Sequence, residues 1–98
     1  MLAGLTHEDF RRRVHQKCQV HHGPSSLEME LIECRKLGTA GRKESPREPF
    51  ALVFRGPKTP VLSQRMYPIE FQELGTLEIF IVPVGPDESG IQYEAIFT

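Results

Sequence analysis

Apolar and polar residues alternate along most of the chain, and the strongest alternation lies near its end. Leu77, Ile79 and Ile81 share one face of a predicted strand over 76–84. After the turn signal in GPDESG, a second apolar run covers 91–98. Both runs are rich in β-branched and apolar residues, which favour strands. The pattern predicts a long β-hairpin that forms the core of the protein.

Four further segments alternate in a similar way and are predicted to be strands. They lie at 17–22, 27–37, 49–55 and 66–71. Pro68 has no amide hydrogen to donate to a ladder, so its strand is expected at a sheet edge or with a bulge. The segment 38–48 is rich in Gly, Ser, Lys, Arg and Glu without apolar periodicity, and is predicted to be an exposed, mobile loop.

The N-terminal segment carries a helix signal over 6–16. Thr6 and Asp9 have the spacing of a capping box, with Asp in place of the usual Glu. Phe10 and Val14 then form a narrow apolar stripe. So short a helix is marginal alone, and it is expected to dock on the rest of the protein.

Two of the predicted strands have an outer face that begins polar and becomes apolar. In the first, Glu30 gives way to Ile32; in the second, Glu78 gives way to Phe80 and Val82. Part of this outer face therefore needs a cover. The N-terminal helix or a partner subunit would each provide one.

One helix and six strands with short turns predict an α+β fold that is mainly antiparallel β. The short helix packs on a strongly bent five- to six-stranded sheet or a small partial barrel. The 98 residues suit a single domain over 1–98. No apolar run approaches the length of a membrane span, and the first residues are too short for a signal-peptide core. We therefore expect a cytoplasmic protein without membrane contact.

The net charge of −1 hides an uneven distribution along the chain. Residues 1–59 hold eleven Lys and Arg against seven Asp and Glu, whereas residues 60–98 hold one Arg against six acidic residues. We expect the two halves to interleave in one sheet, which would remove this segregation in space. If it survived folding, it would favour head-to-tail self-association or a polar partner. The charge is too balanced for a nucleic-acid binder.

Four residues come closest to a metal-binding set: Cys18, His21, His22 and Cys34. Their spacing matches no established zinc site, and core or edge positions explain them better. We predict neither a bound metal nor a cofactor. Cys34 is placed with Ile32 on the outer face of its strand.

A Cys–His pair is the nearest approach to a nucleophilic site. Cys18 near His15 or His22 could imitate one, but a buried, protonated thiol is the simpler interpretation. The serines lie in turns and connections, without a nucleophile-elbow motif. The sequence therefore predicts that the protein is not an enzyme.

Two Gly-Pro sequences each follow an apolar strand: Arg55-Gly56-Pro57-Lys58 and Val84-Gly85-Pro86-Asp87. If the two strands are neighbours, both sequences lie at one rim, where Arg55 and Lys58 could bind an anionic ligand or a partner loop. In the simpler interpretation, Gly-Pro only ends a strand and blocks further pairing at its edge.

Four sequence blocks span nearly the whole chain: LAGLTHEDF at 2–10, FALVFRGP at 50–57, FIVPVGPD at 80–87 and YEAIF at 93–97. In these blocks the chain resembles a small bacterial domain family of unknown function. The resemblance implies a bacterial, single-domain protein and points to phage-like systems as one setting. It supplies no catalytic residues.

The sequence therefore predicts a non-enzymatic protein–protein interaction or assembly module. Such a module would self-associate or dock on a larger partner through a strand edge or the surface around Ile32, Phe80 and Val82. The alternative is a small-ligand-binding β-barrel that uses the rim near Arg55 and Lys58. A metal or thiol enzyme is a third, weaker hypothesis.

Overall fold

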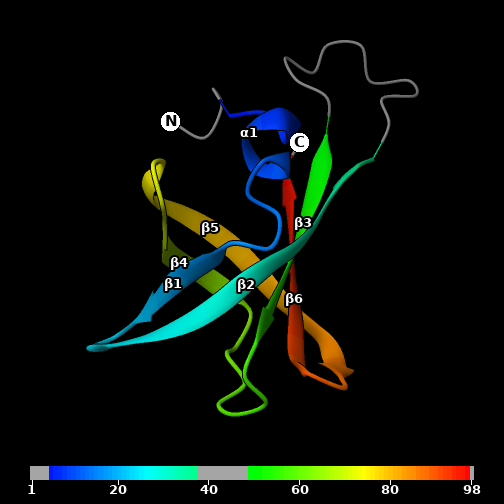
Figure 1. The fold of residues 1–98 in the computed structure, drawn as a ribbon. Helices are drawn as coiled ribbons and strands as arrows, with labels where there is room; N and C mark the ends of the chain where they lie inside the picture. The colour runs from blue at the N-terminus through cyan, green and yellow to red at the C-terminus, as the bar shows by residue number, and fades with distance from the viewer. Residues whose placement is uncertain (1–4, 38–48, 98) are drawn as a thin grey trace.

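The computed structural model describes residues 5–37 and 49–97. These residues form a short helix and six strands that close into an antiparallel barrel (Figure 1). The elements are α1 (His7–Arg11), β1 (Lys17–His22), β2 (Ser25–Lys36), β3 (Phe50–Gly56), β4 (Arg65–Phe71), β5 (Gly75–Asp87) and β6 (Gly90–Phe97). The order around the barrel is β1-β2-β3-β6-β5-β4, and β4 pairs back onto β1. The loop predicted at 38–48 lies outside the described residues.

The prediction of a mainly antiparallel β protein with one short helix is confirmed for the described residues. The barrel is closed, whereas the sequence suggested a bent sheet or a partial barrel. The fold is better described as mainly β than as α+β, because α1 is the one helix among the described residues and has five residues. α1 ends at Arg11, although the apolar stripe predicts helix to 16, because the chain turns after it and His15 adopts a positive φ of 79°.

The predicted C-terminal hairpin consists of β5 and β6. Its turn lies further along than the sequence suggested, because β5 continues through Gly85 with a shift in register between Pro83 and Gly85. The reversal follows Asp87, whose Oδ1 accepts hydrogen bonds of 2.8 Å from the amides of Ser89 and Gly90. Gly-Pro therefore does not end this strand.

α1 closes one end of the barrel (Figure 1). Phe10 is completely buried, and its ring lies 5.5 to 5.7 Å from the rings of Phe50, Phe71 and Phe97. Phe50 and Phe97 are paired across β3 and β6, and their rings stack at 4.8 Å. The helix therefore covers the end of the core and leaves the outer faces of β2 and β5 uncovered.

The segment between β3 and β4 lies at the opposite end of the barrel (Figure 1). Leu62 is buried there, and its amide donates a 2.9 Å hydrogen bond to the hydroxyl of Tyr93. The hydroxyl of Tyr67 donates to the carbonyl of Ser63 at 2.8 Å. With an aromatic cluster at one end and this segment at the other, core side chains fill the interior.

A bulge in β2 changes which residues face outward. The register against β3 shifts between Leu31 and Glu33, so one residue of β2 has no counterpart. Beyond the bulge Cys34 packs against the core, while Ile32 is half-buried. The prediction that Ile32 and Cys34 share the outer face is wrong, because one extra residue exchanges the two faces of a strand.

Candidate functional site

The outer surface of β4, β5 and β6 carries an exposed row of large apolar side chains. Met66 pairs with Phe80 across β4 and β5, and Ile96 is exposed on β6, beyond the Val82–Glu94 pair at which the β5–β6 register ends. We call Met66, Phe80 and Ile96 the apolar row. Their exposed fractions are 51%, 46% and 53%. Adjacent strands are about 4.8 Å apart, so Met66 and Phe80 form a continuous apolar strip across β4 and β5.

Further apolar side chains extend this strip along β5. Val82 is half-buried, and Val84 is exposed. Six large apolar side chains are exposed among the described residues, and four of them lie on these three strands. The other two are Leu37 and Val61, which lie outside the strands. The apolar exposure is therefore concentrated on one side of the barrel.

Carboxylates border the apolar row on both sides. Glu78 pairs with Pro68 on one side, and Glu94 pairs with Val82 on the other. Glu70 lies further along the outward face of β4 and is exposed. Arg65, exposed at the start of β4, is the one Lys or Arg on these three strands. The surface is thus an apolar strip within an acidic border.

The charge segregation of the sequence survives folding. β1, β2 and β3 are consecutive around the barrel, and so are β6, β5 and β4. The expectation that the two halves interleave is wrong, because β3 and β6 meet at one seam and β1 and β4 at the other. Among the described residues before 60, eight Lys and Arg face five Asp and Glu; from 60 onward, one Arg faces six.

The predicted contact residues do not form one surface. Phe80 and Val82 belong to the apolar strip, but Ile32 lies on β2, and β3 and β6 stand between β2 and β5. Met66 and Ile96 were missed by sequence reasoning. Ile96 lies between the buried Ala95 and Phe97, and Met66 precedes the buried Tyr67, which signals outward positions. The pairing of Met66 with Phe80, however, depends on strand order and register.

The two Gly-Pro sequences lie at one rim, because β6 runs between β3 and β5 and pairs with both. The Nε and Nη2 atoms of Arg55 each lie 2.9 Å from Oδ2 of Asp87. Gln92 donates to the same oxygen at 2.8 Å. Hydrogen bonds from the side chain of Gln92, the amide of Ser89 and Arg55 hold the pKa of Asp87 well below its usual range.

An open depression of about 350 Å³ lies beside this rim. Its lining includes Lys17, Glu28, Glu30, Arg55 and, as an apolar wall, Met29. The guanidinium of Arg55 is held by Asp87, and the two glutamates make the depression mixed in charge. Lys58, the other predicted rim cation, is exposed on the connection after β3. Its side chain does not line this depression.

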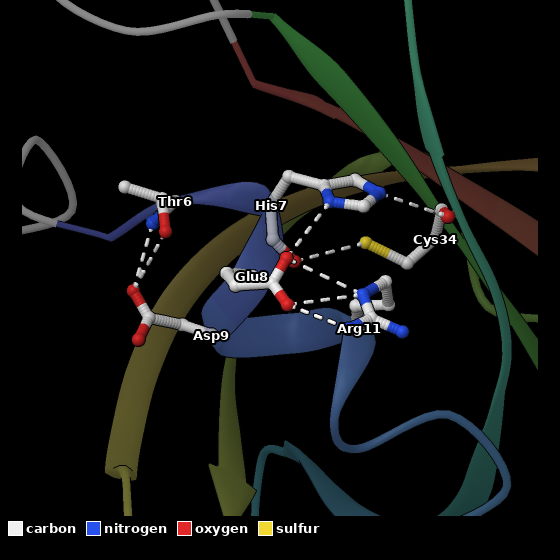
Figure 2. A network of polar contacts seen from close by, with 6 residues as sticks. All are labelled: Thr6, His7, Glu8, Asp9, Arg11 and Cys34. Carbon is white, nitrogen blue, oxygen red and sulfur yellow. Dashed lines mark hydrogen bonds and ion pairs between the residues drawn. The ribbon is translucent and has the colours of Figure 1, made fainter.

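A polar network fixes α1 to β2 (Figure 2). Nε2 of His7 donates to the carbonyl of Cys34 at 3.3 Å, and Sγ of Cys34 donates to the carbonyl of His7 at 3.5 Å. Nδ1 of His7 is buried without a hydrogen bond, 4.0 Å from Oε1 of Glu8. Glu8 is held in turn by Arg11, whose Nη2 lies 2.6 Å from Oε2. This network was not expected from the sequence.

The network does not create a nucleophile. The ring of His7 faces the carbonyl of Cys34 rather than its sulfur, and burial raises the pKa of that thiol to about 11. Cys18 lies in the barrel core, where burial raises the pKa of its thiol to about 12. Both thiols are therefore protonated near neutral pH, which makes them poor nucleophiles.

The sequence cluster of cysteine and histidine residues is not brought together. Cys18 points into the core, Cys34 lies against His7, and His21 contacts Glu70 with Nε2 3.3 Å from Oε1. In residues 5–37 and 49–97, no three His, Cys, Asp or Glu side chains are grouped so that they could hold a metal ion.

Comparisons with known proteins identify the family without adding a function. Within the described parts of the chain, no helix is both long and apolar enough to cross a membrane. Neither a curated protein nor a solved structure matches the chain. The model of one family, described as a domain of unknown function (DUF6916), matches residues 5–97. The chain therefore belongs to the DUF6916 family of domains of unknown function.

Proposed function

We propose that the protein is a non-enzymatic interaction module that docks on another protein through the apolar row of Met66, Phe80 and Ile96. The observation that carries this proposal is the cross-strand pairing of Met66 with Phe80, both about half-exposed, together with the exposed Ile96 on β6. Contiguous exposed apolar strips with a polar border are typical of protein–protein interfaces.

The surroundings of the apolar row support this assignment. α1 docks at the end of the barrel and does not cover the row, so the row is available to a partner. The interior is filled by the core, which favours a function on the outer surface. The bacterial and cytoplasmic setting, with phage-like systems as one context, rests on the resemblance of the sequence blocks and belongs to the same proposal.

The test compares two matched variants of the immobilised protein, Phe80→Ser and Val61→Ser. Both replace an exposed apolar side chain by the same small polar one, but Val61 lies on the connection between β3 and β4, outside the strands that carry the row. We expect a specific partner retained from a bacterial lysate to be lost with Phe80→Ser and kept with Val61→Ser. If both variants retain the same proteins as the wild type, the apolar row is not the docking surface.

Binding of a small anionic ligand at the rim is the second candidate. It is favoured by the depression of about 350 Å³ beside Arg55, which Lys17 also lines. The two glutamates in its lining and the Arg55–Asp87 contact make it the weaker of the two. A rise in melting temperature with a small dicarboxylate, abolished by Lys17→Gln, would support it. An unchanged melting temperature would exclude that ligand class at this rim.

A further inference from the structure

The first part of β2 has an unpaired edge. β1 pairs with β2 along 25–30, but the pairing of β2 with β3 starts only at Glu30, opposite Arg55. Residues 25–29 are therefore paired on one side only, and the tip of the β1–β2 hairpin projects beyond the neighbouring strands (Figure 1). An unpaired strand edge is a template for pairing with another chain.

The backbone hydrogen bonds of β2 show which groups are free on this edge. The amide of Leu31 donates to the carbonyl of Gln16 at 3.0 Å, and its carbonyl accepts from the amide of His15 at 2.6 Å. The backbone of Leu31 thus points towards the segment that leads into β1. Successive strand residues direct these groups to opposite sides, so those of Ser26 and Glu28 point away from β1. Within the described residues, no strand pair or backbone hydrogen bond engages them there.

The space beside this edge is open. Ser26 and Glu28 are exposed, and Leu27 between them is half-buried against the core. The depression of about 350 Å³ borders Glu28 at the point where β3 ends, because Gly56 and Pro57 also line it. A second strand therefore has room to pair with the edge beyond the end of β3.

The edge is complementary to itself in one antiparallel register. With Leu27 on the two-fold axis, Ser26 of each copy lies opposite Glu28 of the other, and the free amides and carbonyls of both residues are all paired. The two Leu27 side chains then meet at the centre, and each Glu28 faces a hydroxyl group rather than a like charge.

The two neighbouring registers are less favourable. An axis at Glu28 would place two carboxylates directly opposite each other, which is destabilising. An axis at Ser26 would place Glu28 opposite Pro24, which has no amide hydrogen to donate. The backbone groups and the charges of the edge thus select the register centred on Leu27.

We infer that β2 pairs with β2 of a second copy of this chain along residues 25–29, antiparallel and with Leu27 at the centre. The inference does not rest on docking through the apolar row, because β1 stands between β2 and the strands that begin the row. The contact is short, whereas stable interfaces bury about 1,200 Å² or more. We therefore expect a weak dimer, with a dissociation constant between about 10 μM and about 1 mM.

Sedimentation equilibrium of the full chain, at concentrations from about 10 μM to about 1 mM, tests this inference. We expect a reversible equilibrium between monomer and dimer in the wild type. Ser26→Pro should abolish the dimer and leave the monomer folded, because proline removes an amide hydrogen that no strand of the monomer uses. Circular dichroism melting of dilute samples checks that each variant is folded.

Two charge variants test the register. Ser26→Lys places a cation opposite Glu28 of the other copy and should tighten the dimer by about two- to tenfold. Ser26→Glu places a like charge there and should weaken the dimer by a similar factor. Gln72→Lys and Gln72→Glu make the same changes of charge at an exposed turn after β4 and should leave the dimer unchanged.

The outcomes separate this inference from docking at the apolar row. A protein that stays monomeric up to about 1 mM overturns pairing through β2, and so does a dimer that Ser26→Pro and both charge variants leave unchanged. Loss of the dimer with Phe80→Ser but not with Ser26→Pro would assign self-association to the row and also overturn it. A dimer that Phe80→Ser keeps and Ser26→Pro removes supports pairing through β2, whatever the row binds.

Discussion

The backbone of Gly90 lies directly against the carbonyl oxygen of Gly56, and no side chain fits between them. A Cβ atom at position 90 would overlap that oxygen. Gly56 pairs with Ile91 across β3 and β6, and Asp87 pairs with Gly90 across β5 and β6. The close approach thus joins the ends of three strands at the rim where Arg55 meets Asp87.

Gly90→Ala is therefore expected to lower the free energy of unfolding by about 1 to 3 kcal/mol, because the added methyl group must displace the backbone of β3. Urea denaturation measures the change. Ser89→Ala is the matched control at the exposed neighbouring position, with an expected effect within about 0.5 kcal/mol. Equal stability of the two variants would show that the strands are not packed this closely.

Phe10 is the side chain through which α1 stabilises the barrel. Phe10→Ala should cost about 3 to 5 kcal/mol of unfolding free energy, because it leaves a cavity among Phe50, Phe71 and Phe97. Arg12→Ala, on the exposed side of the same turn, should change the stability by no more than about 0.5 kcal/mol. If Phe10→Ala does not fold, Phe10→Leu gives a smaller, measurable loss. A loss no larger than that of Arg12→Ala would exclude α1 as the end of the core.

Local sequence patterns predicted the parts of the fold that depend on neighbouring residues. The alternation of Leu77, Ile79 and Ile81 placed all three in the core, because each strand residue points opposite to the next. The spacing of Thr6 and Asp9 also predicted a contact that forms: the amide of Thr6 donates to Oδ2 of Asp9 at 2.9 Å.

The remaining features depend on residues that are distant in the sequence. Pairing of β3 with β6 brings Arg55 close to Asp87, although the two residues are 32 positions apart in the sequence. No local sequence pattern predicts this contact. The bulge after Leu31 depends on the register against β3, and it reverses the faces expected for Ile32 and Cys34. In the candidate site, Phe80 was predicted to face outward, but its cross-strand neighbour Met66 follows only from strand order and register.

Acid should weaken the rim through Asp87. Its pKa is held low in the folded protein, chiefly by the hydrogen bond from Gln92 and then by the amide of Ser89. As the pH falls below the ordinary aspartate pKa near 4, the unfolded chain takes up the proton first. The stabilisation by the Asp87 carboxylate is therefore fully present above about pH 4 and is lost below it.

Asp87→Asn tests this dependence. We expect a lower melting temperature at neutral pH and a smaller further decrease between about pH 5 and about pH 2 than in the wild type. Glu88→Gln is the control, because this neighbouring carboxylate is exposed. If acidification lowers the melting temperatures of the wild type and Asp87→Asn by the same amount, Asp87 is not a source of acid sensitivity.

The seam between β1 and β4 should be the weakest part of the barrel wall. β1 and β4 share two aligned pairs, Gln19 with Glu70 and Val20 with Ile69, whereas β3 and β6 share seven. Few cross-strand hydrogen bonds favour local opening. Hydrogen exchange followed by mass spectrometry should therefore show faster exchange in peptides of β1 and β4 than in those of β3 and β6.

His21 tests whether side chains support this seam, because its Nε2 lies 3.3 Å from Oε1 of Glu70 across it. His21→Ala should speed exchange in β1 and β4 by about two- to fivefold, as expected for the loss of an exposed pair, and leave β3 and β6 unchanged. His22→Ala is the matched control on the same strand. Faster exchange throughout the barrel would instead indicate global destabilisation, and equal protection of β4 and β6 in the wild type would contradict a weak seam.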